Sequence, residues 1–321
     1  MDLIYMNPRH EDLGVLLDYD VDMAFGQDEN NFECTIAASS HCCGSGYFLY
    51  IEGTEFGGII DGIESISEAK EVIYSGRTWH GILNSKVIEP DSGEAYLTVS
   101  GEANAVLGDL LSRLSLTDLF EASTEDSGLT ISGYKMNRYI KGYDGILKML
   151  KKVGGKLLFT VKEGKVILSA APIHDYTQDE EFDSDLVDFN AKKRFRTVNH
   201  LICLGSGELE SRTVIHLYAD AEGNISKTQT QFGLDEYTEV YDYSSVESAE
   251  ELESSGTDAL KALWEPAELS LDFDADTGVY DIGDIVGAYD NVTQISVSAV
   301  ISKKIVTIQD GQVTISYKVG E

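Results

Sequence analysis

Three aspartates at alternating positions, Asp272, Asp274 and Asp276, are the first residues in this sequence whose spacing could support chemistry. Alternating carboxylates supply the hard oxygen ligands that Ca²⁺ prefers. However, Gly278 comes one position later than in an EF-hand loop, and Gly283 stands where the closing bidentate glutamate belongs. A solvated acidic strand end explains the pattern better, so the three aspartates remain only a candidate calcium site.

A second group with chemical potential is His41-Cys42-Cys43, with Cys34 nearby. Imidazole and thiolate ligands bind Zn²⁺, but the C-x-x-C spacing is absent and no second pair follows. Small thiols buried in a β core explain these residues better. A Cys–His nucleophile stays open, although no local motif supports it. The four cysteines also predict no disulfide framework, which indicates folding in a reducing cytoplasm.

Paired carboxylates could also serve glycoside hydrolysis, but with 56 acidic residues in the chain some pair is always available. The Gly-Ser-Gly stretch at 205–207 lacks the lysine and the following helix pattern of a phosphate-binding loop. Each candidate thus has a simpler structural explanation. The sequence predicts no enzyme, no cofactor and no metal.

The charge of the chain bounds its partners. Lys and Arg total 24 against 56 Asp and Glu, which leaves a formal charge of −32 over 321 residues. A field of this sign repels nucleic-acid backbones and anionic membranes, so we expect no stable nucleic-acid binding. No apolar run approaches the length needed to cross a bilayer, and residues 1–30 show no signal peptide, so we expect no membrane anchor.

The C-terminal stretch predicts a β-hairpin with a defined register. Asp310-Gly311 is a two-residue turn signal, because both central positions of a type I′ turn need positive φ. Pairing outward from this turn places the apolar residues on one face and the polar residues on the other. The expected pairs are Ile308 with Val313, Val306 with Ile315, Gln309 with Gln312 and Thr307 with Thr314.

The rest of the chain changes character near Gly101. Residues up to about 90 read as short strands broken by glycines, and residues 101 to about 172 predict two amphipathic helices followed by a hairpin about Glu163-Gly164. A third helix is predicted near 245–264, with Ser244 or Ser245 as its cap. Strands then resume to the C-terminus.

Two segments resemble the siphophage tail-hub proteins, which are related in fold to the central baseplate hubs of contractile phages. The first is 74–90, with Gly76, Arg77, Trp79 and Leu83, and the second is 280–321. The second segment contributes the motif residues Asp281, Gly283, Asp284, Ile285, Asp310 and Gly311. The intervening helices and hairpin also follow the order of elements in that family.

The resemblance implies a structural protein of the virion tail, made in the host bacterial cytoplasm. In such hubs each subunit contributes two similar β-barrels, so a homotrimer forms a ring with sixfold pseudo-symmetry. Such a ring joins a hexameric distal-tail or tail-tube ring to the tail tip. Its implied partners also include the tape-measure protein and a tip or fibre protein.

We therefore expect an α+β fold, predominantly antiparallel β, with two curved β-barrel domains and an inserted helix-helix-hairpin domain. The predicted domains are a first barrel of 1–98 plus 186–217, an insert of 101–180 and a second barrel of 218–321. Strands Gly57–Ile63 and Asp281–Gly287 are expected to present open edges to neighbouring subunits. The alternatives are a receptor- or glycan-binding adhesion module, which calcium could control, and a cell-wall hydrolase of the tail tip.

Overall fold

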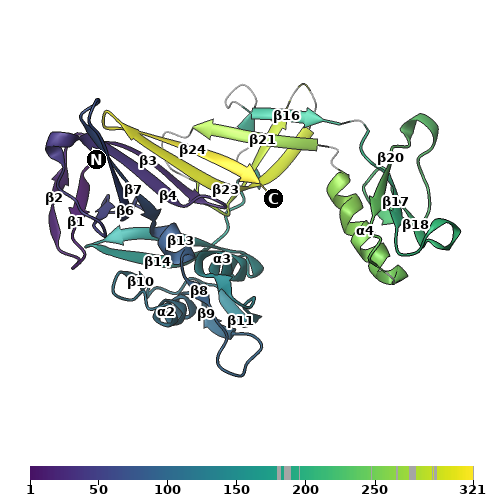
Figure 1. Cartoon of the computed structure of the whole chain (residues 1–321), viewed down its shortest axis with the longest axis horizontal. Helices are drawn as coiled ribbons and strands as arrows, with labels where there is room; N and C mark the ends of the chain where they lie inside the picture. Colours follow the sequence, from purple (N-terminus) through teal and green to yellow (C-terminus); the bar gives the residue numbers. More distant parts are fainter. Residues whose placement is uncertain are drawn as a thin grey trace. The chain divides into compact units, whose positions relative to one another are not determined.

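The computed structural model divides the chain into two compact units, shown in Figure 1. Unit 1 comprises Met1–Phe189, Ser270–Tyr289 and Ser298–Glu321, and unit 2 comprises Asn190–Leu269 and Asp290–Val297. The residues that the structure describes are 1–178, 182–183, 189–194, 196–246, 248–264, 267–274, 280–290, 292 and 295–320. Four strands of the main sheet contain residues of both units, because the chain crosses from one unit to the other within them. They are β16 (Phe189–Lys193), β21 (Ala267–Asp274), β22 (Ile285–Asp290) and β23 (Ile295–Gln309).

Among the described residues, a sheet of thirteen strands is the main element of unit 1, and eleven of them follow the order β16-β21-β24-β23-β3-β4-β7-β6-β5-β1-β2. Two further strands, β15 (Phe182–Asp183) and β22, pair with each other, and β22 also pairs with β23. The remaining bounds are β1 Leu3–Met6, β2 Asp12–Leu16, β3 Asp20–Gly26, β4 Asn31–Ala37, β5 Phe48–Tyr50, β6 Gly57–Ile66, β7 Glu71–Thr78 and β24 Gln312–Gly320.

The C-terminal hairpin β23–β24 forms in the predicted register. Ile308 pairs with Val313, Val306 with Ile315, Thr307 with Thr314 and Gln309 with Gln312. Asp310 and Gly311 have φ values of 51° and 73°, the positive values that a type I′ turn requires. Val306 and Ile308 are fully buried, so the apolar face points into the core. The local turn signal and the alternation of side chains were therefore sufficient to predict this element.

The two ends of the chain meet in the centre of the sheet. Strand β3 pairs antiparallel with β23, from Val21 opposite Ile308 to Gly26 opposite Lys303. Figure 1 shows the N-terminal strands in purple beside the C-terminal hairpin in yellow. The α+β, predominantly antiparallel fold predicted from the sequence is confirmed. In the described part the end strands β2 and β16 do not pair with each other, so the pairings do not close a barrel.

A layer of helices and short strands covers part of the sheet, and we call residues 79–172 the α/β layer. Its helices are α1 (Trp79–Asn84), α2 (Ala103–Arg113) and α3 (Gly142–Lys152). Its strands are β8 Val87–Ile88, β9 Thr98–Glu102, β10 Phe120–Ala122, β11 Thr130–Lys135, β12 Ile140–Lys141, β13 Gly155–Lys162 and β14 Lys165–Pro172. The β13–β14 hairpin turns at Glu163-Gly164 as predicted, with Val161 opposite Val166 and Phe159 opposite Leu168.

The α/β layer and the sheet share one hydrophobic core. Met6, Phe48 and Tyr50 of the sheet are buried together with Trp79 of α1 and with the inward faces of α2, α3 and β13–β14. The helices and the hairpin predicted for 101–180 are thus present in the expected order. They belong to the same compact unit as the N-terminal strands.

In its described residues, unit 2 contains a small four-stranded sheet and one α-helix, α4 (Ala249–Leu263). Its core contains Leu201, Cys203, Leu217, Leu252 and Leu260. The strand order is β19-β18-β17-β20, and β17 pairs antiparallel with β18 and parallel with β20. The bounds are β17 His200–Leu204, β18 Val214–Ala219, β19 Ile225–Ser226 and β20 Thr238–Asp242.

These units differ from the predicted domains in two places. Residues 200–217, predicted to complete the first barrel, instead pair with β20 and pack against α4. Ser298–Glu321, predicted for the second barrel, lies with the N-terminal strands. An apolar strand pattern does not specify its partner, and here β17 and β18 bury their apolar residues against the adjacent helix.

Two local predictions are also corrected. Helix α4 begins at Ala249, and its cap is Ser248, whose hydroxyl accepts a hydrogen bond from the backbone N–H of Glu251 at 3.3 Å, so Ser244 and Ser245 are not the cap. Strand β6 pairs with β7 from Gly58 to Ile66, and its residues Gly57–Ile59 also pair with β5, so the first part of Gly57–Ile63 is not an edge. Among the described helices, none is long and apolar enough to span a membrane. The 3₁₀ turns are Ala38–Ser40, Tyr176–Gln178, Leu209–Ser211 and Gly233–Asp235.

Candidate functional site

A tight turn at Asp281–Asp284 places the carboxylate of Asp284 in the interior of unit 1 and leaves that of Asp281 partly exposed, at 32%. The carboxylate of Asp284 accepts a hydrogen bond from the backbone N–H of Asp281 at 3.0 Å, and the N–H of Asp284 donates to the carbonyl of Asp281 at 3.1 Å. Gly283 has φ of +102°, a conformation that L side chains rarely adopt. The motif Asp-Ile-Gly-Asp is therefore a turn that fixes two carboxylates.

Lys156 of β13 is the cation that these carboxylates surround. Its Nζ lies 2.8 Å from Asp281 Oδ2 and 2.8 Å from each carboxylate oxygen of Asp284. Asp284 is fully buried and also accepts from the backbone N–H of His174 at 2.9 Å. Burial alone would lower the pKa of Lys156, but the hydrogen bonds and charges of Asp281 and Asp284 outweigh it and raise the pKa. Lys156 is therefore charged at neutral pH.

A second buried lysine, Lys304 of β23, extends the network. Its Nζ lies 2.5 Å from Glu55 Oε1 and 3.4 Å from Asp281 Oδ1, and it faces the ring of Tyr317 at 5.7 Å. Burial opposes the charge on Lys304, but Glu55 and Asp281 raise its pKa above the ordinary value. Asp281 thus bridges the two lysines with its two oxygens.

The network joins segments that are distant in sequence: the β5–β6 loop at Glu55, the β13 strand at Lys156, the turn at Asp281 and Asp284, and β23 at Lys304. Three carboxylates face two ammonium groups, so the described charges sum to −1. Each carboxylate already accepts hydrogen bonds from lysine. The arrangement suits holding the α/β layer against the C-terminal hairpin, because removing one partner leaves a buried charge without compensation.

His80 of α1 lies beside this network as a neutral aromatic ring. It is 2% exposed and packs against Phe159 at 3.9 Å and Phe25 at 5.0 Å between ring centroids. Burial, and second the positive charge of Lys304, lower the pKa of His80 to about 3. Its Nε2 is 3.8 Å from Glu55 Oε2, but a neutral ring makes no ion pair at neutral pH.

The first predicted motif also has structural positions. Arg77 makes a bidentate ion pair with Asp61, with Nε and a terminal nitrogen at 2.7 and 2.8 Å from its two oxygens, and also donates to Ser85 Oγ at 3.0 Å. Trp79 and Leu83 of α1 are buried in the core of unit 1. At Gly76, a Cβ atom would lie 1.9 Å from the carbonyl oxygen of Ile59, so the close approach of β6 and β7 requires glycine there.

The remaining motif residues frame these elements. Ile285 begins β22, where its N–H donates to the carbonyl of His174 at 2.9 Å. Asp310 and Gly311 form the exposed tip of the β23–β24 hairpin. The structure therefore brings Asp281 and Asp284 together in one network, with Gly283 in the same turn, whereas the other motif residues each serve a separate turn, ion pair or core position.

Only two of the three aspartates of the candidate calcium site lie among the described residues. Asp276 lies outside the described residues, whereas Asp272 and Asp274 lie on β21, opposite Lys318 and Ser316 of β24. Within the described ranges, no group of three or more His, Cys, Asp or Glu side chains is arranged to hold a metal ion.

The cysteine and histidine cluster is organised by Tyr74. The hydroxyl of Tyr74 lies 2.9 Å from His41 Nδ1 and accepts from the backbone N–H groups of Cys42 and Cys43 at 3.1 and 3.2 Å. Burial, with the neighbouring acidic and cysteine groups, raises the pKa of Cys34 and of Cys43 to about 12. Both therefore remain thiols at neutral pH, which suits a β core better than a nucleophile or a metal ligand.

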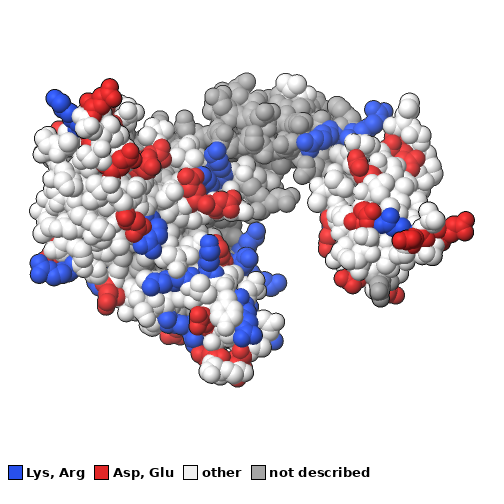
Figure 2. Space-filling model, in the orientation of Figure 1, with Lys and Arg blue, Asp and Glu red and all other residues white. Residues whose placement is uncertain are grey.

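Charge is unevenly distributed along unit 1. Residues 1–97 carry 18 Asp or Glu against 4 Lys or Arg, whereas residues 98–178 carry 9 against 10. On the face seen in Figure 2, Lys and Arg gather over the α/β layer. Residues 98–178 are therefore nearly neutral, and the strong negative charge of the chain comes from the other residues.

No family model matches the sequence, and no curated protein matches it. Solved structures match in fold. The 43 kDa tail protein of prophage MuSo2 from Shewanella oneidensis aligns with a TM-score of 0.53 at 11% identity, over 100% of this chain and 98% of that chain. A chain from the phage P2 baseplate, in its activated conformation with Ca, aligns with a TM-score of 0.50 at 10% identity, over 98% of each chain.

The chain has the fold of a phage tail protein. A tail protein from Neisseria meningitidis MC58 also aligns, at a TM-score of 0.49, 12% identity and coverage of 100% and 96% of the two chains. The matches to the MuSo2 tail protein and to the P2 baseplate chain confirm, at the level of the fold, the resemblance predicted from residues 74–90 and 280–321. Sequence reasoning did not find Glu55, Lys156 and Lys304, although the position of Lys304 on the inward face of β23 was an available signal.

Proposed function

We propose that this protein is a structural component of a phage tail or prophage tail, located in the tail of the virion. The observation that carries this proposal is the match of the whole fold, over 98% or more of each chain, to a prophage tail protein and to a phage baseplate chain. Matches that span both units argue against a shared small module alone, because they follow the whole path of the chain.

Within the tail, the proposed role is that of a hub. Three copies form a ring with sixfold pseudo-symmetry that connects a hexameric distal-tail or tail-tube ring to the tip. A tape-measure protein and a tip or fibre protein are the further partners. This role rests on the resemblance of the two sequence motifs to tail-hub proteins, and the network at Lys156 and Lys304 supports it by connecting the α/β layer to the C-terminal hairpin within unit 1.

The edge strand β2 is the candidate contact for assembly. It is the last strand of the main sheet, and Leu13, Val15 and the following Leu17 are 48%, 41% and 85% exposed. Exposed apolar edge strands in natural proteins are normally covered. Continuation of the sheet from subunit to subunit would cover this edge.

Assembly works against the charge of the chain, since each copy carries −32. Salt screens such repulsion within about 10 Å at 0.1 M ionic strength. The trimer is therefore weak in dilute buffer and is favoured by high salt, by high protein concentration or by the adjoining tail ring.

Light scattering coupled to gel filtration, across protein and salt concentration and with the tail-ring protein present, tests this proposal. The expected species is a trimer that increases with salt. The variant Val15→Lys is expected to shift the equilibrium to monomer, whereas Val87→Lys, also at an exposed valine of a strand in unit 1, is expected to leave it unchanged. A monomer under every condition, including the presence of the ring protein, contradicts the hub role.

The two alternative functions have their own tests. Binding to whole cells or glycans that depends on calcium would favour an adhesion module. Clearing of peptidoglycan that a single carboxylate or cysteine substitution abolishes would favour a hydrolase.

A further inference from the structure

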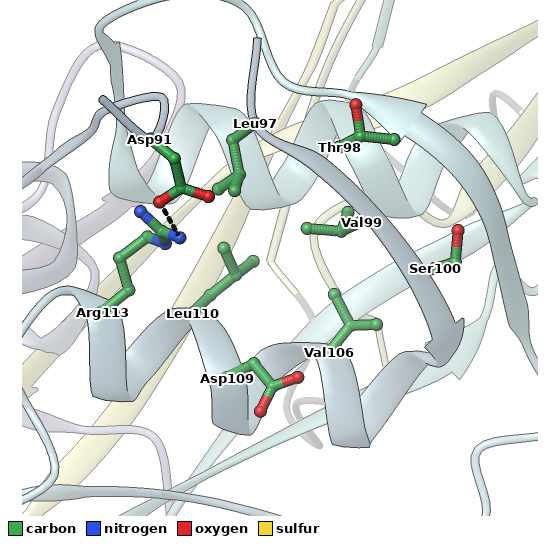
Figure 3. A pocket seen from close by; sticks show the side chains of 9 residues that line it. All are labelled: Asp91, Leu97, Thr98, Val99, Ser100, Val106, Asp109, Leu110 and Arg113. Atoms are coloured by element: carbon green, nitrogen blue, oxygen red, sulfur yellow. Dashed lines mark hydrogen bonds and ion pairs between the residues drawn. The ribbon is translucent and has the colours of Figure 1, made fainter. Parts of the chain in front are cut away.

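A groove lies between strand β9 and helix α2 in the α/β layer. It has a volume of about 650 Å³ and lies on the side of β9 that faces α2. Figure 3 shows Leu97 and Val99 from the strand side converging with Val106 and Leu110 of α2. Its size falls in the range of ligand-binding pockets in proteins.

Strand β9 offers an open backbone edge at this groove. Among the described strands it pairs only with β11, with Thr98 opposite Lys135 and Val99 opposite Tyr134. The N–H of Met136 donates to the carbonyl of Leu97 at 2.8 Å, so the backbone groups of Leu97 and Val99 face β11. Because antiparallel strands alternate these directions, the N–H and C=O of Thr98 face the opposite edge.

The side chains of the groove define the chemistry of an occupant. Leu97, Val106 and Leu110 form the floor and are themselves buried, at 8%, 3% and 1% exposed, and one end is closed by the ion pair of Arg113 with Asp91 at 2.8 Å. Asp109, which is exposed on α2, also lines the groove, and it has no ion-pair partner among the described residues. Two carboxylates against one guanidinium leave the groove with one uncompensated negative charge.

We propose that this groove binds an extended segment of another protein, which adds as a strand to the open edge of β9. An open strand edge beside a helix is the arrangement in which peptides bind by strand addition, with backbone hydrogen bonds for affinity and side-chain pockets for selectivity. Alternate side chains of the segment point to α2 and lie on this floor. One of them is a lysine or arginine that pairs with Asp109.

This site is independent of the proposed trimer. The assembly edge β2 belongs to the main sheet, whereas β9 belongs to a separate two-stranded sheet. A failure of the groove proposal therefore leaves the hub role untouched. Likewise, a failure of the hub role leaves the groove proposal untouched.

Fluorescence anisotropy with a short labelled peptide tests the proposal on the full-length protein. In the probe, every second residue is threonine, and the residues between the threonines are valine, lysine and valine. The two valines and the lysine are the side chains that face α2. The control peptide carries glutamate in place of lysine. We expect saturable binding of the lysine peptide and about fivefold weaker binding of the glutamate peptide, as exposed ion pairs contribute up to about 1 kcal/mol.

Two variants and one control locate the binding. Thr98→Pro removes the N–H that faces the open edge, and proline is tolerated at such edge positions, so we expect about tenfold weaker binding of the probe with the fold retained by circular dichroism. Asp109→Lys is expected to reverse the preference between the two peptides. Asp118→Lys changes an exposed aspartate of the same layer outside the groove and is expected to leave binding unchanged.

The proposal is overturned if the lysine peptide does not bind at millimolar concentration, or if Asp109→Lys leaves the preference between the peptides unaltered. It is also overturned if Thr98→Pro or Asp109→Lys dissociates an oligomer of this chain, because the occupant of the groove is then a second copy. Binding of an α-helical peptide with equal affinity would likewise contradict strand addition.

Discussion

Lys156 and Asp284 form a buried ion pair across 128 positions of sequence, with the lysine Nζ at 2.8 Å from both carboxylate oxygens. The lysine side chain is 9% exposed and the aspartate is fully buried. The pair connects strand β13 of the α/β layer to the turn that precedes β22. A contact of this kind determines how the layer and the sheet fit together, because each charge requires the other.

Loss of either partner of this pair is expected to destabilise unit 1. Lys156→Met leaves Asp284 buried without its cation, and removal of one partner from a buried pair costs about 3–5 kcal/mol. The control is Lys227→Met, which breaks the exposed pair with Glu253 and is expected to cost less than about 1 kcal/mol. Urea denaturation measures both. Equal effects of the two substitutions would contradict the role of the network.

Part of this site could be read from the sequence. The turn at Asp310-Gly311 fixes the register of the hairpin, and in that register Lys304 lies on the same face as Val306 and Ile308. A lysine on an inward face requires a counterion. Its partner Glu55, however, is 249 positions away, and no local pattern identifies a partner at that distance.

The same limit explains the predicted domains. Local features such as the hairpins and the helices were correct, because turns and side-chain periodicity encode them. The pairing of β3 with β23 and the placement of β17 beside β20 depend on tertiary packing. An alternating strand shows which face is buried, but it does not show which strand lies beside it.

Gly76→Ala is expected to destabilise the sheet at the β6–β7 pairing. The new methyl group would lie 1.9 Å from the carbonyl oxygen of Ile59, and a backbone atom cannot move aside cheaply. We expect a loss of about 1–3 kcal/mol, as for overpacked sites. The matched control is Gly108→Ala in α2, whose nearest neighbour would be Ala122 Cβ at 3.6 Å. That change should stabilise by up to about 1 kcal/mol through helix propensity, and thermal unfolding measures both.

Gly256→Ala is expected to destabilise unit 2 selectively. In α4 the new Cβ would lie 2.4 Å from Cys203 Sγ and 3.0 Å from Leu217 Cδ1, so the helix and the sheet would have to separate. Replacing Cys203 by alanine removes the sulfur, so the double variant is expected to lose less stability than the sum of the two single variants. Calorimetry should show the change in the transition of unit 2, since the two units have separate cores. Strict additivity would contradict this contact.

His80 is expected to give unit 1 a dependence of stability on acid pH. Its folded pKa of about 3 lies below the ordinary value of 6.5, because burial and the charge of Lys304 disfavour the protonated ring. The unfolded chain therefore binds more protons between these values, and the stability that His80 contributes is complete above pH 6.5 and is lost as the pH falls toward 3. The expected slope is about 1.4 kcal/mol for each pH unit within that window.

The variant His80→Phe removes this titration while keeping an aromatic ring beside Phe25 and Phe159. Urea midpoints of the unit 1 transition between pH 7 and pH 4 should therefore fall less steeply for the variant than for the parent protein. His216→Phe, at an exposed histidine of unit 2, is the control and should leave the unit 1 slope unchanged. Parallel slopes for His80→Phe and the parent protein would show that the His80 ring does not remain neutral in the folded core.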